Sequence, residues 1–148
     1  WVRTDPWETG FVDITGEQSL LGQVDGRTSA AVKAWLDARS EAFRAGIEVV
    51  VIDPPAFAKA KSEVGSALSG FARLAELACG VLAPQGTLVM ASCTARIDAD
   101  ALAGAIRTGA ARADRELAEW QRTAHGLDHP VRFREGAYLK CIWLRAAR

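Results

Sequence analysis

Several residue types that mark simple functional classes are scarce in this 148-residue sequence. Its three cysteines, Cys79, Cys93 and Cys141, form no CxxC pair, and their odd number argues against a disulfide framework and against a zinc site. The two histidines, His125 and His129, have no cluster of further metal-ligating residues around them. The sequence therefore predicts no bound metal and no disulfide-stapled secreted fold.

Long apolar runs and an excess of one charge are also missing. No stretch reaches membrane-spanning length and no signal-peptide pattern opens the chain, so we expect a cytoplasmic protein without membrane association. The 18 basic residues balance the 18 acidic ones, so no basic field indicates nucleic-acid binding by charge alone. The length fits one domain, residues 1–148, and the first residue, Trp1 rather than Met, indicates a piece of a longer chain.

The most informative stretch that is present is residues 48–57, with the sequence EVVVIDPPAF. Its β-branched run predicts a strand buried on both faces, as in a parallel sheet covered by helices. Pro54 and Pro55 then forbid sheet pairing and an immediate helix, because proline lacks an N–H donor and fixes φ. Asp53 is thereby held at the carboxyl end of the strand, where open α/β sheets bind ligands. With Phe57 as a ring for stacking, the stretch indicates a nucleobase pocket; the alternative is a strand exit in which Asp53 only caps a turn.

The rest of the chain alternates between helical and strand patterns. Residues 1–26 are rich in Gly, Asp and Thr and predict loops with one short strand at most. Three helices are predicted, over residues 28–45 with Trp35 in the core, 67–82 and 98–113. Further strands are predicted over residues 87–91, 117–121 and 138–144, with Trp143 in the core and a short partner strand at 131–133. This order predicts an α/β domain with right-handed crossovers.

Six short motifs follow one another in an order and spacing that identify a family. They are DPPAFAK (53–59), GF (70–71), LAPQG (82–86), ASCT (91–94), DHP (128–130) and EGAYLK (135–140). Together they resemble the carboxyl half of the class I S-adenosylmethionine-dependent methyltransferases that make 5-methylcytosine in large-subunit ribosomal RNA. The resemblance covers about residues 32–145. It implies a Rossmann-like sheet, mostly parallel with an antiparallel terminal strand, in which the strands ending at Asp53 and Cys93 are neighbours.

The resemblance also implies a role for each matching residue. Cys93, the one cysteine that follows a strand and opens a loop, is the expected nucleophile toward carbon 6 of cytosine. Asp53 is expected to hydrogen-bond the cytosine edge and to stabilise the ring nitrogen as it becomes protonated. Lys59, Lys61 and the cofactor's positive charge are the candidate sources of charge that favours the thiolate. The substrate is ribosomal RNA, the cofactor is S-adenosylmethionine, and the remaining candidates are Pro54, Pro55, Phe57, Lys59 and His129 for substrate and Asp53, Pro54 and Asp13 for cofactor.

The part of the family pattern that binds the cofactor is poorly matched by this sequence. No strand, Gly-rich turn and helix can be recognised in residues 1–26, a segment that stays unassigned. Asp13 is the only candidate for the ribose-binding acid, and the position expected to bind the adenine amino group falls near Ala31. We therefore expect a methyltransferase domain that is truncated at its N-terminus.

Two alternatives to cytosine-5 methylation stay open. Enzymes that methylate exocyclic amines carry motifs similar to DPPxF, and in such an enzyme Cys93 would be a bystander. A chain without the cofactor loop could instead be a degenerate, non-catalytic module that binds RNA or protein. Nothing in the sequence indicates the oligomeric state.

Overall fold

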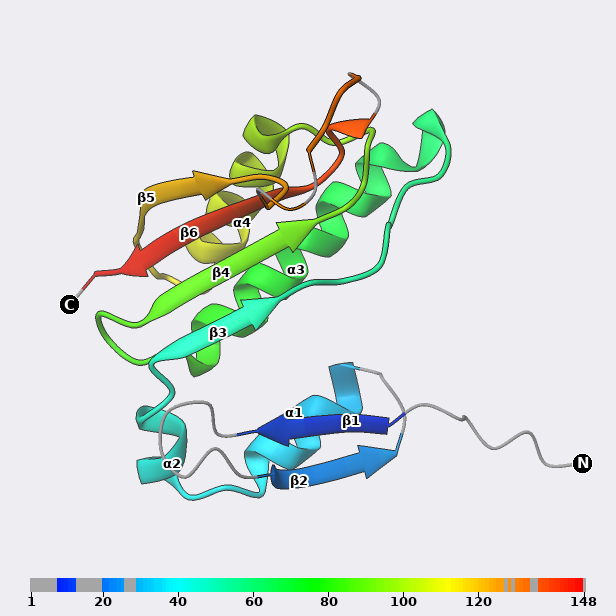
Figure 1. The fold of residues 1–148 in the computed structure, drawn as a ribbon. Coiled ribbons are helices and arrows are strands. Elements are labelled where there is room, and N and C mark those ends of the chain that lie inside the picture. Colours follow the sequence, from blue (N-terminus) through cyan, green and yellow to red (C-terminus); the bar gives the residue numbers. More distant parts are fainter. Residues whose placement is uncertain are drawn as a thin grey trace, which may run out of the picture. The chain divides into compact units, whose positions relative to one another are not determined.

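The computed structural model describes residues 8–12, 20–25, 29–126, 128, 130–133 and 136–147. The chain forms two compact units, Trp1–Arg44 and Ala45–Arg148 (Figure 1). The predicted site residues that the structure describes all belong to the second unit, because the DPPAFAK and ASCT segments both follow Ala45.

The first unit contains an antiparallel strand pair and two short helices. β1 (Glu8–Val12) pairs with β2 (Leu20–Asp25), where the sequence predicted loops and one strand at most. The single helix predicted to reach Ala45 is wrong, since α1 (Ser29–Asp37) ends early and α2 (Glu41–Ala45) starts anew. Ser40 explains the break, because its hydroxyl accepts a hydrogen bond from the Phe43 N–H (3.1 Å) and caps the second helix.

Trp35 forms the core of this first unit, as predicted. Its side chain is buried, its ring meets Phe43 edge-on at a centroid distance of 5.8 Å, and the Arg39 guanidinium lies 4.5 Å from the ring centroid. Gly22 of β2 approaches so closely that a Cβ atom there would lie 2.6 Å from the indole nitrogen. Only glycine leaves room for the tryptophan at this position.

The second unit follows the predicted alternation of strands and helices. Its elements are β3 (Val49–Ile52), the 3-10 turn η1 (Lys61–Glu63), α3 (Val64–Val81), β4 (Thr87–Ser92), α4 (Ala99–Arg112), β5 (Leu117–Thr123) and β6 (Lys140–Ala146). The predicted cap of α4 is confirmed, since the Asp98 carboxylate accepts a hydrogen bond from the Ala101 N–H (2.7 Å). The predicted strand at 131–133 is wrong, because those residues form a loop and β6 is already paired on both edges.

The sheet of the second unit has the strand order β3-β4-β6-β5. β3 pairs with β4 in parallel, with Ile52 opposite Met90, whereas β6 is antiparallel to both β4 and β5. It follows that β3, β4 and β5 run in one direction and β6 in the other. The predicted sheet with an antiparallel terminal strand, and the predicted neighbourhood of β3 and β4, are both confirmed.

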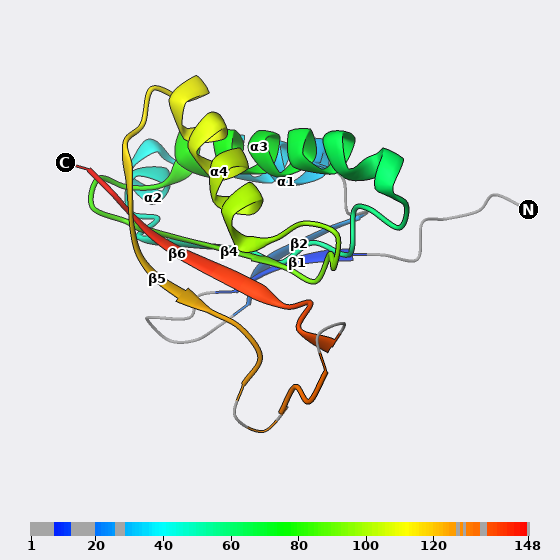
Figure 2. The ribbon, with the colours of Figure 1, turned by 90° about the horizontal axis from the view of Figure 1, so that it is seen from above.

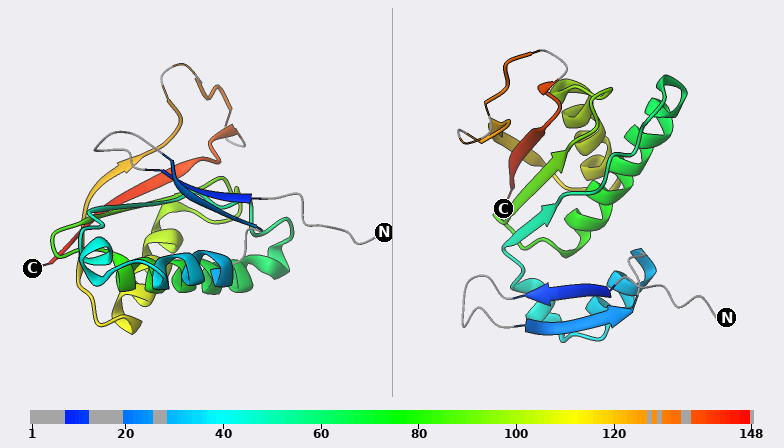
Figure 3. Two further views of the ribbon diagram at one scale, coloured as in Figure 1. Left: turned by 90° about the horizontal axis from the view of Figure 1, so that it is seen from below. Right: turned by 45° about the vertical axis from the view of Figure 1, so that its right-hand side comes forward.

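Both long helices lie on the same face of this sheet, α3 beside α4 (Figures 2 and 3). On that face Leu88 and Met90 of β4 and Ile142 and Leu144 of β6 are fully buried together with helix residues such as Phe71. β4 is also buried on its second face, at Val89, as predicted.

β3 is not buried on both faces, contrary to the prediction. Val50 and Ile52 pack against the core under α3, but Val49 is 41% exposed and Val51 is 62% exposed. The reason is its place at the edge of the sheet, with helices of its own unit on one face only. The β-branched run thus indicated a strand correctly but overstated its burial.

The two helices cross at a single close point. A Cβ atom at Gly109 of α4 would lie 2.1 Å from the Ala72 carbonyl oxygen of α3 and 2.8 Å from the Ala75 Cβ atom. The small residues at this crossing let the two backbones approach closely and fix how α4 lies against α3.

Candidate functional site

Asp53 lies where β3 ends and the chain leaves the sheet. β3 stops at Ile52, and Asp53, Pro54 and Pro55 have no regular structure, as the two prolines predict. Asp53 and Pro55 are exposed and Pro54 is half-buried. The carboxylate is therefore free of core packing and accessible to a ligand at the carboxyl edge of the sheet.

Cys93 lies at the same edge, directly after β4. β4 ends at Ser92, and the register that places Ile52 opposite Met90 puts Asp53 and Cys93 just beyond the ends of neighbouring parallel strands. Cys93 is half-buried. The structure thus brings the two predicted catalytic residues to one edge, although within the described residues no hydrogen bond or ion pair joins their side chains directly.

Thr94 connects the two segments that carry Asp53 and Cys93. Its side chain is 1% exposed, and its Oγ1 atom accepts a hydrogen bond from the Phe57 N–H (3.2 Å). Its own N–H donates to the Ser92 hydroxyl (3.1 Å), which closes the turn around Cys93. The loop after β3 is therefore fixed to the loop after β4 by a buried threonine, a contact that sequence reasoning missed.

Phe57, predicted as a stacking ring for the substrate, packs into the protein. Its ring lies 4.9 Å from that of Phe71 in α3, and a Cβ atom at Gly70 would be 3.4 Å from it. This explains why Gly70 and Phe71 belong to the same motif set as Phe57. A role in substrate binding remains a prediction for Phe57, whose ring is half-buried.

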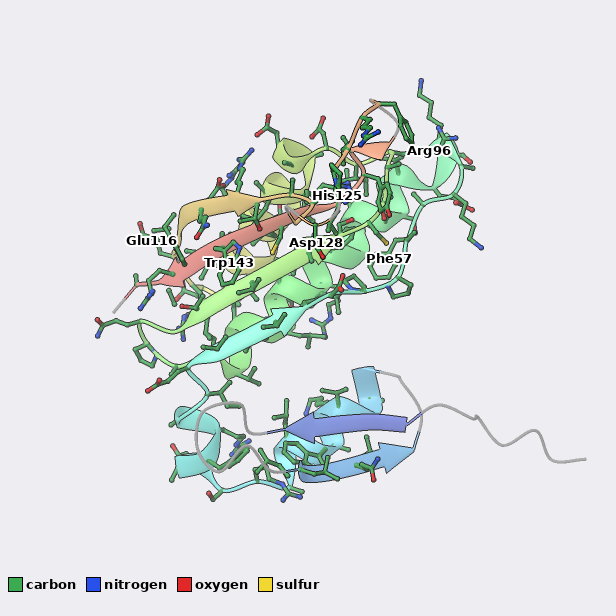
Figure 4. The ribbon with its side chains drawn as sticks, in the orientation of Figure 1. Phe57, Arg96, Glu116, His125, Asp128 and Trp143 are labelled. Carbon is green, nitrogen blue, oxygen red and sulfur yellow. The ribbon has the colours of Figure 1, made fainter. Side chains whose placement is uncertain are left out.

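The loop that follows Phe57 is held by charged groups acting on its backbone. The Glu63 carboxylate accepts hydrogen bonds from the N–H groups of Lys59 (2.7 Å) and Ala60 (2.9 Å), and these bonds lower the pKa of Glu63. Arg96 donates from Nε to the Lys59 carbonyl (3.1 Å), so both strand-end loops are tied a second time (Figure 4). The Lys59 side chain is exposed.

A buried lysine, Lys140, lies behind the Cys93 turn. It is the first residue of β6, opposite Ser92, and its ammonium donates hydrogen bonds to the carbonyls of Thr94 and Ile97. Burial lowers its pKa, while the negative charges of Cys93 and Asp98 act in the opposite direction. Its role was not predicted from the sequence; the signal was a lysine at the start of a mostly apolar strand, inside the EGAYLK motif.

His125 is the histidine that the structure describes in this region. The Nε2 atom of His125 accepts a hydrogen bond from the Leu139 N–H (3.2 Å), and its ring meets Tyr138 edge-on at 4.8 Å (Figure 4). His129 lies outside the described residues, so its role stays a prediction. His125 positions the backbone next to Lys140.

The other two cysteines lie within regular secondary structure rather than in a loop after a strand. Cys79 lies in α3 and is 2% exposed, and burial raises the pKa of its thiol. Burial likewise raises the pKa of Cys141, which lies within β6. Asp53 raises this pKa further, whereas a hydrogen bond to Thr123 lowers it.

Trp143, predicted as core, is half-buried on the sheet face away from the helices and contacts Trp120 and Thr123.

The first unit was expected to carry the cofactor side of the domain. Asp13 lies outside the described residues, and Ala31 is in α1 rather than at a strand end; the strand of this region ends at Asp25. In the described ranges β1 and β2 form an antiparallel pair, not a strand followed by a Gly-rich turn and helix.

Across the described ranges no three metal-ligating side chains come together. The helices found there are too short or too polar to span a membrane.

Two solved structures that share this arrangement are described as methyltransferases. One, a methyltransferase complexed with SAH, superposes on 77% of this chain and 30% of its own with a TM-score of 0.56 and 18% identity. A second, assigned as a SAM-dependent methyltransferase from Streptococcus mutans, gives a TM-score of 0.52 and 16% identity over 77% of this chain and 29% of its own. The fold is thus the predicted Rossmann-like methyltransferase fold.

Proteins similar to this chain in sequence are named as ribosomal RNA large subunit methyltransferases. The chain is 33% identical over 125 residues to a ribosomal RNA large subunit methyltransferase of Deinococcus radiodurans, a match covering 84% of this chain and 30% of that protein. It is 35% identical over 100 residues to ribosomal RNA large subunit methyltransferase I of Shewanella amazonensis, covering 66% and 25%. The chain therefore spans less than a third of the length of these relatives. No protein-family model matches it.

Proposed function

We propose that this chain forms the substrate side of an S-adenosylmethionine-dependent methyltransferase that acts on carbon 5 of cytosine in ribosomal RNA. The proposal rests on similarity to large-subunit ribosomal RNA methyltransferases over most of the chain. The observation that carries the finer assignment is the convergence of Asp53 and Cys93 at one sheet edge, held together through Thr94 and Phe57. The cysteine would be unnecessary for methylating an amine.

The reaction needs an activated ring, because carbon 5 of cytosine is a weak nucleophile. The Cys93 thiolate donates an electron pair to carbon 6 and forms a carbon–sulfur bond, which shifts electron density toward carbon 5. Asp53 stabilises the ring nitrogen that gains a proton in this step, from an exposed position where the base can reach it. After carbon 5 has been methylated, a base takes the carbon 5 proton and the electron pair of that bond forms the carbon 5–carbon 6 double bond. The carbon–sulfur bond then breaks with its electron pair on sulfur, and the ring nitrogen gives up the proton that it gained.

S-adenosylmethionine supplies the methyl group for carbon 5 in this scheme. Among the described residues, Asp53 and Pro54 are the ones we propose to face it. Described residues that would grip its carboxylate end with backbone N–H groups are missing, since Gly10 and Gly22 lie in the antiparallel pair. We therefore place the substrate side, and not the whole cofactor site, on the described part of this chain.

The product base tests this proposal. Replacing the matching segment of the Deinococcus radiodurans relative by this chain gives a chimera that also carries that protein's other segments. With S-adenosylmethionine and unmodified ribosomal RNA, nucleoside analysis should find 5-methylcytidine. A methylated exocyclic amine would instead support the amino-methyltransferase alternative. A folded chimera that binds S-adenosylmethionine but methylates no base would favour a non-catalytic module.

A further inference from the structure

Lys140 is a lysine in an unusual place. Its side chain is 8% exposed, whereas lysines are almost never buried unless they are paired. Its ammonium has three N–H donors, and the carbonyls of Thr94 and Ile97 accept from it. Those two carbonyls belong to the loop that begins at Cys93, so the ammonium holds this loop from within.

The positive charge of Lys140 acts mainly on the loop that begins at Cys93. No carboxylate forms an ion pair with it in the part of the chain that the structure describes. Titratable groups on the segments around it are Cys93, Asp98 at the start of α4, His125 beside Leu139, Asp53 at the end of β3, and its chain neighbours Tyr138 and Cys141. Of these, Cys93 and Asp98 act on Lys140 electrostatically.

The lysines singled out from sequence are less suited to influence Cys93. Lys59 and Lys61 are both exposed, and solvent and salt screen exposed charges over short distances. Lys140 is buried. It is the first residue of β6, and β6 pairs with β4, the strand that directly precedes Cys93. A buried charge acts more strongly on a neighbour, because less water separates the two groups.

We propose that Lys140 is a positioning residue for Cys93: it fixes the loop that carries the thiol and supplies the positive charge that favours the thiolate. In the step concerned, the thiol proton passes to water, Lys140 keeps its own proton, and the sulfur retains the electron pair that later bonds to carbon 6. The purpose of this arrangement rests on the proposed function, but the effect on the thiol does not require RNA.

Alkylation of the 148-residue chain with iodoacetamide measures the effect directly. Mass spectrometry reports the labelling rate of each cysteine as a function of pH. In Lys140→Met, Cys93 should react about tenfold more slowly at pH 7, and its rate should rise at higher pH than in the wild type. Lys140→Arg, which keeps the charge, should restore most of the rate, and Cys79 should be unchanged in both variants. An unchanged pH profile of Cys93 in a folded Lys140→Met chain would overturn the proposal.

A reciprocal measurement covers the case in which Lys140→Met does not fold. Two coupled groups shift each other's titration equally, so removing the Cys93 thiol must also shift the titration of Lys140. In Cys93→Ala, whose side chain is smaller and only half-buried, NMR of the Lys140 side chain should show its titration moving to lower pH. A titration identical to the wild type would contradict the proposal. Coupling without 5-methylcytosine formation would leave this inference standing and refute the proposed reaction, so the two failures can be told apart.

Discussion

At the scale of single residues, the arrangement of the candidate site depends on one buried side chain, that of Thr94. Its backbone and hydroxyl join three segments: the loop after β3, the turn after β4 and the start of β6. Thr94→Val keeps the shape but leaves the Phe57 N–H without its acceptor. We expect a loss of about 1–3 kcal/mol in the free energy of unfolding, measured by urea denaturation.

A matched control exists for this substitution on α4. The Thr108 hydroxyl also makes a hydrogen bond to the backbone, donating to the Gly104 carbonyl, but it is exposed and water can replace it. Thr108→Val should change the stability by about 0.5 kcal/mol or less. Equal effects of the two substitutions would show that the Thr94 bond does not hold the loops together.

The buried thiol of Cys79 predicts a dependence of stability on alkaline pH. Burial raises its pKa above the ordinary value of 9.0, so the unfolded chain ionises at lower pH than the folded one. The stabilisation is complete below pH 9.0 and is lost as the pH rises through the folded-state pKa. Cys79→Ala should therefore lose less stability between pH 7 and pH 10 than the wild type, in urea denaturation at each pH. It should be the less stable protein at pH 7, by about 1–2 kcal/mol, because of the cavity.

At the scale of elements, the sequence located most of the second unit because its patterns are local. The apolar spacing of α3, the Asp98 cap of α4 and the proline exit after β3 each act within a few residues. The failures involve partners distant in sequence. Residues 131–133 have a strand pattern, but β6 pairs with β4 and β5, which no local pattern reveals. The break at Ser40 was a local signal that the longer helical pattern concealed.

Gly109 gives a direct test of the α3–α4 crossing. Gly109→Ala places a methyl group 2.1 Å from the Ala72 carbonyl oxygen, so one helix must move. We expect a destabilisation of about 1–3 kcal/mol or more by thermal or urea denaturation.

The control for that substitution lies in the same helix. At Gly104 no atom lies within 4 Å of the added Cβ atom, and alanine favours a helix over glycine. Gly104→Ala should stabilise the protein by about 0.5–1 kcal/mol. If Gly109→Ala behaved in the same way, the described crossing would be wrong.

At the scale of the whole molecule, the sequence motifs located the two segments of the proposed substrate site but not the contacts that hold these segments together. Asp53 and Cys93 could be paired from sequence, because strand ends meet at one edge of a parallel sheet. The contacts of Thr94, Arg96 and Lys140 span 37 to 46 residues and depend on packing that periodicity does not encode. The exposure of β3 was likewise invisible, since a β-branched run does not say whether a strand is central or at an edge.

The residues that the structure describes predict how well this chain binds S-adenosylmethionine. The described residues include the proposed substrate-binding edge but no strand, Gly-rich turn and helix that could bind S-adenosylmethionine. Isothermal titration of residues 1–148 alone should detect weak binding or none. Binding in the micromolar range would mean that this chain carries a complete cofactor site of another design.

The most direct measurement of the central claim is a covalent trap. RNA containing 5-fluorocytosine withholds the proton whose loss releases the enzyme, so the chimera described above should form an adduct that survives denaturing electrophoresis. Peptide mapping should place the adduct on Cys93, and Cys93→Ala should abolish both adduct and methylation, whereas Cys79→Ala and Cys141→Ala keep both. A Cys93→Ala chimera that still methylates its RNA would contradict the account.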